Sequence, residues 1–183
     1  MNSPEEQEWL QAAQRFDMEA LAAIYDQYSP RLYAYAMRLL GDADKAEECV
    51  AETFARFLQA LHAGHGPRQH LQAYLYRIAH NWITDRYRRE PPPNLNIEIH
   101  PLSDPAPPLE EAAEAQWMRQ RLRWALWQLT PEQRQAILLR FVEGLDNETV
   151  AAALQKPVGA VKALQHRALA ALKRLLKPEV EHV

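Results

Sequence analysis

The sequence predicts an all-α protein built from two small helical domains. Leucine and alanine recur throughout, and only 5 of the 183 residues are glycine, which disfavours a sheet-rich fold and a glycine-rich phosphate loop. Seven of the 13 prolines fall between residues 91 and 108, where the missing amide donors prevent a helix from continuing. The length suits one ordinary domain or two small ones, and the proline cluster favours two.

The proline cluster predicts a flexible linker over residues 90–111, between one domain at 1–89 and another at 112–177. Residues 90–114 carry six acidic side chains and no lysine or arginine. Such a composition favours an extended, solvated strip rather than a packed element.

Helices of the first domain are predicted from caps and from the spacing of apolar residues. Ser3 precedes Pro4, and Glu6 lies three residues after Ser3, which is the pattern of a capping box at a helix start. Apolar residues then recur every three or four positions, as one face of a helix requires. We expect helices from Pro4, over 17–28, from Pro30 to about 40, from the Asp42 cap to about 63, and over 71–89.

Helices of the second domain are predicted from the same signals. Thr130 and Pro131 repeat the cap and first-turn proline, with Gln133 in the position that closes a capping box. Gly144 separates the second of these helices from the third. We expect helices at about 110–128, 131–143, 147–154 and 158–176.

Charge is distributed unevenly although the whole chain has a formal net charge of only −3. Residues 1–67 contain 5 basic and 11 acidic side chains, whereas residues 68–89 contain 5 basic and one acidic. Residues 119–177 contain 11 basic and four acidic side chains. The first domain therefore has an acidic and a basic part, and the second domain is basic, as expected for a surface that meets nucleic acid.

The same composition excludes several other classes of protein. With Cys49 as its single cysteine, the chain cannot form an internal disulfide or a cysteine-based zinc site. The first residues lack the basic start and apolar core of a signal peptide, and no apolar run approaches the roughly 18 residues of a membrane span. We therefore expect a cytoplasmic protein without membrane insertion.

The C-terminal part has the proportions of a helix-turn-helix. A short helix over 147–154 is followed by a turn at 155–157 and a longer basic helix. Its apolar side would carry Val161, Leu164, Ala168, Leu169 and Leu172. Polar groups would lie nearer solvent, where they could meet bases and phosphates. The simpler alternative is a solvated surface helix that binds nothing.

Several stretches resemble regions of bacterial sigma factors. Residues 129–145, 148–154 and 158–169 resemble region 4, and residues 46–54 and 74–89 resemble region 2. Their order and the acidic linker are similar to the extracytoplasmic-function, or group IV, sigma factors of the sigma-70 family. The resemblance covers about 17–89 and 112–174. It implies a monomer when free that binds core RNA polymerase and promoter DNA and starts transcription, without enzymatic activity or a cofactor.

The resemblance places the polymerase contact on the acidic helix of the first domain, at Glu48, Glu52 and Phe54. Carboxylates with an aromatic anchor suit a basic coiled coil, because charge sets the orientation and apolar burial provides affinity. In similar sigma factors the asparagine equivalent to Asn81 forms, with the preceding loop at 64–70, a pocket for an unstacked base of the minus-ten element.

Basic residues complete the expected DNA contacts. Three arginines would hold the backbone of the opened minus-ten strand, and five residues of the second domain would meet the minus-thirty-five element. Trp82 has two interpretations, a core residue or a stacking platform for a base. The expected backbone contacts are Arg86, Arg88 and Arg89, and the expected contacts of the second domain are Lys156, Lys162, Gln165, His166 and Arg167.

The sequence also departs from the family pattern. Ala51 stands where the family usually has glutamine after the acidic pair, and Gln155 stands where a glycine usually ends the first helix of the helix-turn-helix. In the second helix Ala160, Ala163 and Leu164 replace the common threonine, serine and arginine. These positions put the details of polymerase and promoter binding in question.

Other functions compete with this interpretation. The histidines at 62, 65, 70 and 80 could suggest a metal site, although no carboxylate supports them and we expect no metal. No nucleophile with an oriented base is present in any local motif, so we expect no enzyme. The strongest alternative is a stand-alone helix-turn-helix regulator that binds DNA without polymerase. An anti-sigma factor is a further partner that the resemblance allows.

Overall fold

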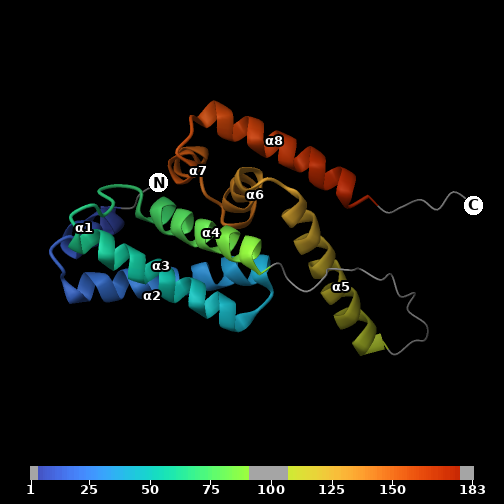
Figure 1. Ribbon diagram of the computed structural model, residues 1–183, viewed down its shortest axis with the longest axis horizontal. Helices are drawn as coiled ribbons and strands as arrows, with labels where there is room; N and C mark the ends of the chain where they lie inside the picture. Colours follow the sequence, from blue (N-terminus) through green and yellow to red (C-terminus); the bar gives the residue numbers. More distant parts are fainter. Residues whose placement is uncertain (1–3, 91–106, 178–183) are drawn as a thin grey trace, which may run out of the picture.

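The computed structural model describes residues 4–90 and 107–177, and the elements in these ranges are all helices joined by turns and loops, without a strand (Figure 1). The all-α prediction is therefore confirmed. The core of the predicted linker, residues 91–106, lies outside the described residues.

Four helices form the first unit: α1 (Pro4–Ala13), α2 (Met18–Leu40), α3 (Ala43–His62) and α4 (Leu71–Arg89). Helices α2, α3 and α4 pack against one another, and α1 packs on α2 (Figure 1). Asp17 caps α2 by accepting a hydrogen bond from the Ala20 amide at 2.9 Å, and Asp42 caps α3 through the Lys45 amide at 3.0 Å. The last two helices occupy the positions that the sequence predicts.

The expected break before Pro30 was wrong, because α2 continues through that residue. Tyr28 and Leu32 on either side of Pro30 are buried in the same core, and Ile24 and Tyr35 extend the stripe one turn further each way. Burial of this stripe outweighs the roughly 3 kcal/mol that an interior proline costs a helix. Tertiary packing thus joins two predicted helices into one.

The second unit contains α5 (Pro107–Gln128), α6 (Pro131–Ile137), the π-helical turn η1 (Leu138–Val142), α7 (Asn147–Leu154) and α8 (Val158–Leu175). Helix α5 begins a few residues before the expected start, because prolines are tolerated in the first turn of a helix, where the amides have no intrahelical partner. The capping box at Thr130 is present, with both hydrogen bonds at 3.2 Å.

Helices α7 and α8 form the predicted helix-turn-helix (Figure 1). Gln155, where the family usually has glycine, adopts a left-handed conformation with φ 55° and ψ 43°. Its backbone amide donates to the Ala152 carbonyl at 3.3 Å. The turn therefore forms in the geometry that favours glycine, with a side chain in its place.

The two units pack against each other and share one apolar core (Figure 1). Helix α4 of the first unit contacts α7, and α2 contacts α5. The sequence predicts two domains but contains no signal for this contact. Helix α4 therefore has two buried faces, one within its own unit and one toward the second unit.

Candidate interfaces for a protein partner and for DNA

The acidic surface of α3 presents two of the three residues predicted for the protein partner. Glu48 and Glu52 have side chains that are 52% and 40% exposed. Glu52 pairs with Arg56 at 2.7 Å one turn further along the helix, and Glu48 pairs with Arg86 of α4 at 3.5 Å. Both carboxylates are thus accessible, and each already has a cation beside it.

Phe54, the predicted aromatic anchor, instead lies in the core with 8% of its surface exposed. Its ring packs against Tyr25 of α2 at a centroid distance of 4.8 Å. Tyr25 is 48% exposed and is the aromatic ring that this surface presents. The contact predicted for the Phe54 ring therefore falls on a buried side chain.

The predicted minus-ten residues lie along the exposed side of α4. Asn81, Arg88 and Arg89 are exposed. Arg86 is partly buried, pairs with both Glu48 and Glu90 at 3.5 Å, and lies over the Trp82 ring at 5.8 Å. A phosphate contact from Arg86 would therefore require it to exchange partners, whereas Arg88 and Arg89 are available directly.

The loop before α4 lines a cavity of about 260 Å³. His65, His70 and Arg77 line it from the first unit, and Ala152 of α7 closes it from the second. Asn81 is not among the lining residues, so the expected base pocket formed by this loop and Asn81 is not assembled in this arrangement.

The second helix of the helix-turn-helix presents three of its four predicted contacts to solvent. Lys162, His166 and Arg167 are exposed. Gln165, expected on the solvent side, is 8% exposed, and its amide Nε2 donates to Asn147 Oδ1 at 3.0 Å. The Gln165 side chain therefore lies between α8 and α7, and its hydrogen bond connects α8 to the first turn of α7.

Two other positions of this unit also differ from expectation. Leu169, assigned to the apolar side of α8, is 47% exposed. Lys156 in the turn pairs with Glu132 of α6 at 3.0 Å, so a phosphate would have to compete with that carboxylate. The exposed cations of α8 therefore remain the most direct candidates for DNA contacts.

A carboxylate between the two units, which the sequence analysis did not single out, holds them together. Glu143 has only 9% of its side chain exposed and receives hydrogen bonds from Arg38 Nη1 and from the Tyr76 hydroxyl, each at 2.6 Å. Charge-assisted bonds of this length are among the stronger hydrogen bonds in proteins. We refer to Arg38, Tyr76 and Glu143 as the clasp.

His80 forms a second link between the units. The Tyr35 hydroxyl lies 2.7 Å from Nδ1, and Nε2 lies 3.0 Å from the Pro131 carbonyl of the second unit. A carbonyl only accepts, so Nε2 carries the proton and Nδ1 accepts from Tyr35. Burial, assisted by the nearby Arg134 charge, lowers the pKa of His80 to about 3. His80 is therefore a neutral structural residue.

The third link is a sandwich of three side chains. The rings of Tyr87 and Trp127 stack at 3.4 Å with an angle of 9°, and the Arg134 guanidinium lies 3.9 Å from the Trp127 ring centroid. Trp127 Nε1 also donates to the Leu39 carbonyl at 2.8 Å. Arg134 is 2% exposed, and burial lowers its pKa to about 10. Spacing gives no signal for this contact, because its members come from separate units.

The described residues form no metal centre. No group of three or more histidine, cysteine, aspartate or glutamate side chains there is arranged to hold an ion. His62 packs its ring against Phe16 at 6.0 Å, and Cys49 is a buried thiol with its pKa raised to about 12 by desolvation. No helix in the described ranges is long and apolar enough to cross a membrane.

Comparison with known families supports both resemblances. The model for sigma-70 region 2 matches residues 24–91, and a model for sigma-70 region 4 matches residues 119–172. The chain is 30% identical to the ECF RNA polymerase sigma factor SigL of Mycobacterium tuberculosis, over 86% of the chain and 89% of SigL. It is also 30% identical to the ECF sigma factor BldN of Streptomyces coelicolor over 92% of the chain, and spans 65% of BldN.

Two solved structures are similar in fold. CnrH, in complex with the cytosolic domain of CnrY, superposes with a TM-score of 0.70 at 24% identity and covers 94% of this chain and 97% of its own. The sigma factor RpoE from Bartonella quintana, in complex with the anti-sigma factor NepR, gives a TM-score of 0.55 at 26% identity, covering 82% and 92%.

Proposed function

The chain is an RNA polymerase sigma factor of the extracytoplasmic-function group of the sigma-70 family, and we propose which of its surfaces bind core polymerase and promoter DNA. The observation that carries the function is the presence of regions 2 and 4, in that order, in one helical chain. Sigma factors regulate initiation without enzymatic activity, and we propose the same for this protein, acting where polymerase acts, in the cytoplasm.

We propose that Glu48 and Glu52 form the polymerase contact. Both are exposed on one face of α3, four residues apart, as a surface for a basic partner helix requires. Phe54 supports this face from beneath rather than touching the partner, because its ring is buried against Tyr25. Tyr25 is exposed and would make the aromatic contact with the partner in place of Phe54.

We propose that Asn81, Arg88 and Arg89 meet the minus-ten element and that Lys162, His166 and Arg167 meet the minus-thirty-five element. All six are exposed, and the cations among them suit phosphate contacts. Arg86 and Lys156 join them by leaving Glu48 and Glu132, the carboxylates with which they pair. Gln165 would have to leave Asn147, so we assign it a positioning role.

The contact between the units bears on how two promoter elements are reached. With α7 against α4, both DNA-reading surfaces belong to one compact body. We propose that this closed arrangement is the free form and that the units separate when polymerase and promoter bind. The same closed arrangement is compatible with an anti-sigma factor that binds both units and holds them together.

The proposed function is tested by retention of core RNA polymerase on the purified protein, followed by run-off transcription from fragmented host DNA. We expect retention and new, specific transcript starts. Tight, salt-sensitive binding to duplex DNA with no retention of polymerase would instead establish the stand-alone regulator.

The proposed roles are separated by two double variants. Glu48→Ala with Glu52→Ala should weaken core binding, whereas Arg88→Ala with Arg89→Ala should lower open-complex formation and leave core binding intact. Phe54 is unsuitable for this test, because truncating a buried phenylalanine costs about 3–5 kcal/mol of stability. Equal loss of both steps in both doubles, with unchanged thermal unfolding, would contradict the assignment.

A further inference from the structure

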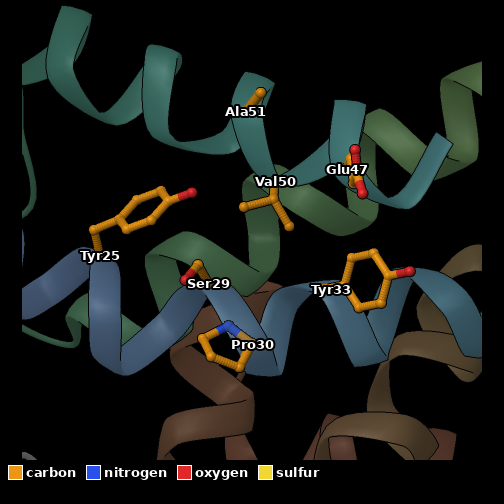
Figure 2. Close-up of a pocket in the computed structure, with 7 residues that line it drawn as sticks. All are labelled: Tyr25, Ser29, Pro30, Tyr33, Glu47, Val50 and Ala51. Atoms are coloured by element: carbon orange, nitrogen blue, oxygen red, sulfur yellow. The ribbon is translucent and has the colours of Figure 1, made fainter. Parts of the chain in front are cut away.

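Two pockets, one in each unit, have opposite charge. In the pocket between α2 and α3, Glu47 is the only charged residue among the described residues of the lining (Figure 2). The other pocket lies between α8 and the junction of α5 with α6, and we call it the basic groove. Its volume of about 610 Å³ lies within the range of about 300–1,000 Å³ for ligand sites. Its described lining contains His166, Arg167 and Arg174 and no carboxylate.

The basic groove has an apolar floor beside its cations. Arg167 and Arg174 are seven residues, or about two turns, apart on one face of α8, and both are exposed. Ala171 lies between them on the same face, and Leu129 and Leu175 add further apolar lining. Neither arginine side chain makes a hydrogen bond or ion pair with another residue of the described ranges. Both guanidinium groups are therefore available to a ligand.

This lining selects an anion. A guanidinium binds a carboxylate or phosphate through two parallel hydrogen bonds, and the side-chain amides of Gln128 and Gln133 supply further donors. A cation would be repelled by the two arginines, and a neutral group would not compensate their charge. The opposite holds for the pocket between α2 and α3, where Glu47 would repel an anion (Figure 2).

The chain leaves α8 at one end of the basic groove. Arg121 of α5 donates from Nη2 to the Lys177 carbonyl at 3.0 Å and to the Leu176 carbonyl at 3.4 Å. Gln128, seven residues after Arg121 on α5, lines the groove together with residues of α8 that precede Leu176. The groove therefore begins near Lys177 and runs back along α8.

The next six residues of the sequence match the groove in charge and in length. Residues 178–183 lie outside the described residues, and their sequence contains Glu179 and Glu181 and no lysine or arginine. Six residues span at most about 20 Å. Arg167 lies ten residues before Lys177, which is about 15 Å along the helix axis. The segment is thus long enough to reach both arginines of the groove.

We propose that residues 178–183, the acidic segment, fold back into the basic groove and place Glu179 and Glu181 against Arg174 and Arg167. In an extended segment two residues that are two positions apart face the same side, so both carboxylates meet α8 together. A segment of the same chain acts at an effective concentration in the millimolar range, so two modest ion pairs suffice to hold it.

The occupied groove restrains DNA binding. His166 and Arg167 line it, and the proposed function assigns both to the minus-thirty-five element. The acidic segment therefore competes with promoter phosphates for the same cations. DNA displaces it because a duplex presents many phosphates and also engages cations outside the groove. This inference rests on the proposed function and adds to it an internal competitor.

The place of the acidic segment is measured on the full chain with a spin label at Val183→Cys, since Cys49 is buried and should stay unlabelled. We expect the label to broaden the amide signals of Gln133 and Ala170 in the groove wall. Glu179→Gln with Glu181→Gln should restore these signals. Broadening that this variant retains in full, or no broadening at all, would overturn the proposal.

The matched control is Glu114→Gln with Glu148→Gln, which changes the net charge by the same amount. Both glutamates are exposed in the second unit and neither lines the groove, so the broadening should persist. A mixture of spin-labelled chains with unlabelled, isotope-enriched chains tests the other occupant. Broadening in that mixture would assign the groove to a second copy and overturn the proposal.

Competition with DNA provides the second test. At low salt, Glu179→Gln with Glu181→Gln should bind a duplex of random sequence about 5-fold more tightly than the wild type, as expected for the loss of two exposed ion pairs. In an Arg174→Gln background the same pair of substitutions should gain only about 2-fold, because one of the two ion pairs is already absent. An equal gain in both backgrounds would reflect net charge alone and would overturn the competition.

The proposal and the proposed function can fail separately. Neither measurement contains polymerase, so a wild type that does not retain core polymerase overturns the proposed function without changing the position of the spin label. If polymerase is retained and the signals of the groove do not respond to Glu179 and Glu181, only the docking of the acidic segment is overturned.

Discussion

The two buried faces of α4 are built from different chemistry. The face within the first unit carries Leu71, Leu75, Ala79 and Ile83, all completely buried and apolar. The face toward the second unit carries Tyr76, His80, Thr84 and Tyr87, which add hydrogen bonds and a stacked ring to the apolar contacts that the two units share. The first face is held by burial of apolar area, which depends little on pH or salt. The second depends, in addition to shared apolar contacts, on a few directed bonds.

This difference indicates which contact can be undone without unfolding the protein. Removing one apolar group from the first face leaves a cavity inside a unit that must stay folded. Removing one charge from the second face weakens a contact between units that each have their own helices. The two faces therefore predict different responses to substitution.

The largest expected effect is on the inner face. Leu75→Ala should lower the free energy of unfolding by about 2–5 kcal/mol, because it combines lost burial with a cavity. Denaturant unfolding followed by circular dichroism measures the loss. A change below about 1 kcal/mol would show that this face is not packed as described.

The clasp should respond by opening rather than by unfolding. Glu143→Gln removes the charge that Arg38 and Tyr76 share, which should cost the closed arrangement about 2 kcal/mol. Fluorescence energy transfer between dyes at Gln59→Cys and Ala170→Cys reports the separation, and buried Cys49 should not be labelled. Glu132→Gln is the matched control. Unchanged transfer in Glu143→Gln would contradict the role of the clasp.

Acid should weaken the same contact through His80. Its pKa is about 3 when buried and 6.5 when exposed, so the opened or unfolded state binds more protons below pH 6.5. The contribution of His80 is complete above pH 6.5 and falls by about 1.4 kcal/mol per pH unit as the pH drops toward 3. Energy transfer between pH 7 and 5 measures opening, and His80→Gln should flatten the dependence. An equally steep dependence in His80→Gln would assign it to other groups.

The smallest effect is expected at a surface pair that belongs to neither face. Lys156→Ala removes the ion pair with Glu132 and should change the free energy of unfolding by less than about 0.5 kcal/mol. The same variant should lower promoter affinity of the holoenzyme and reduce its salt dependence if Lys156 reaches a phosphate. A large loss of stability would mean that this surface ion pair contributes as much to the free energy of unfolding as the buried faces of α4 do.

Much of the local structure could be predicted from the sequence. The caps at Asp42 and Thr130 and the bounds of α4 agree with the structure, because they depend on residues within one turn of each other. Burial of the Phe54 and Gln165 side chains could not be predicted, because α3 and α8 each carry more apolar residues than fit on a single buried face. Which of them faces inward depends on the helix that packs against it.

The sequence alone determined the helical class, the order of the two regions and the position of the helix-turn-helix, because caps, prolines and apolar spacing act over a few residues. Only the tertiary structure decided that α2 passes through Pro30 and that α4 has a second buried face. Each of these depends on side chains distant in sequence meeting at one surface, where burial and hydrogen bonding outweigh local preference.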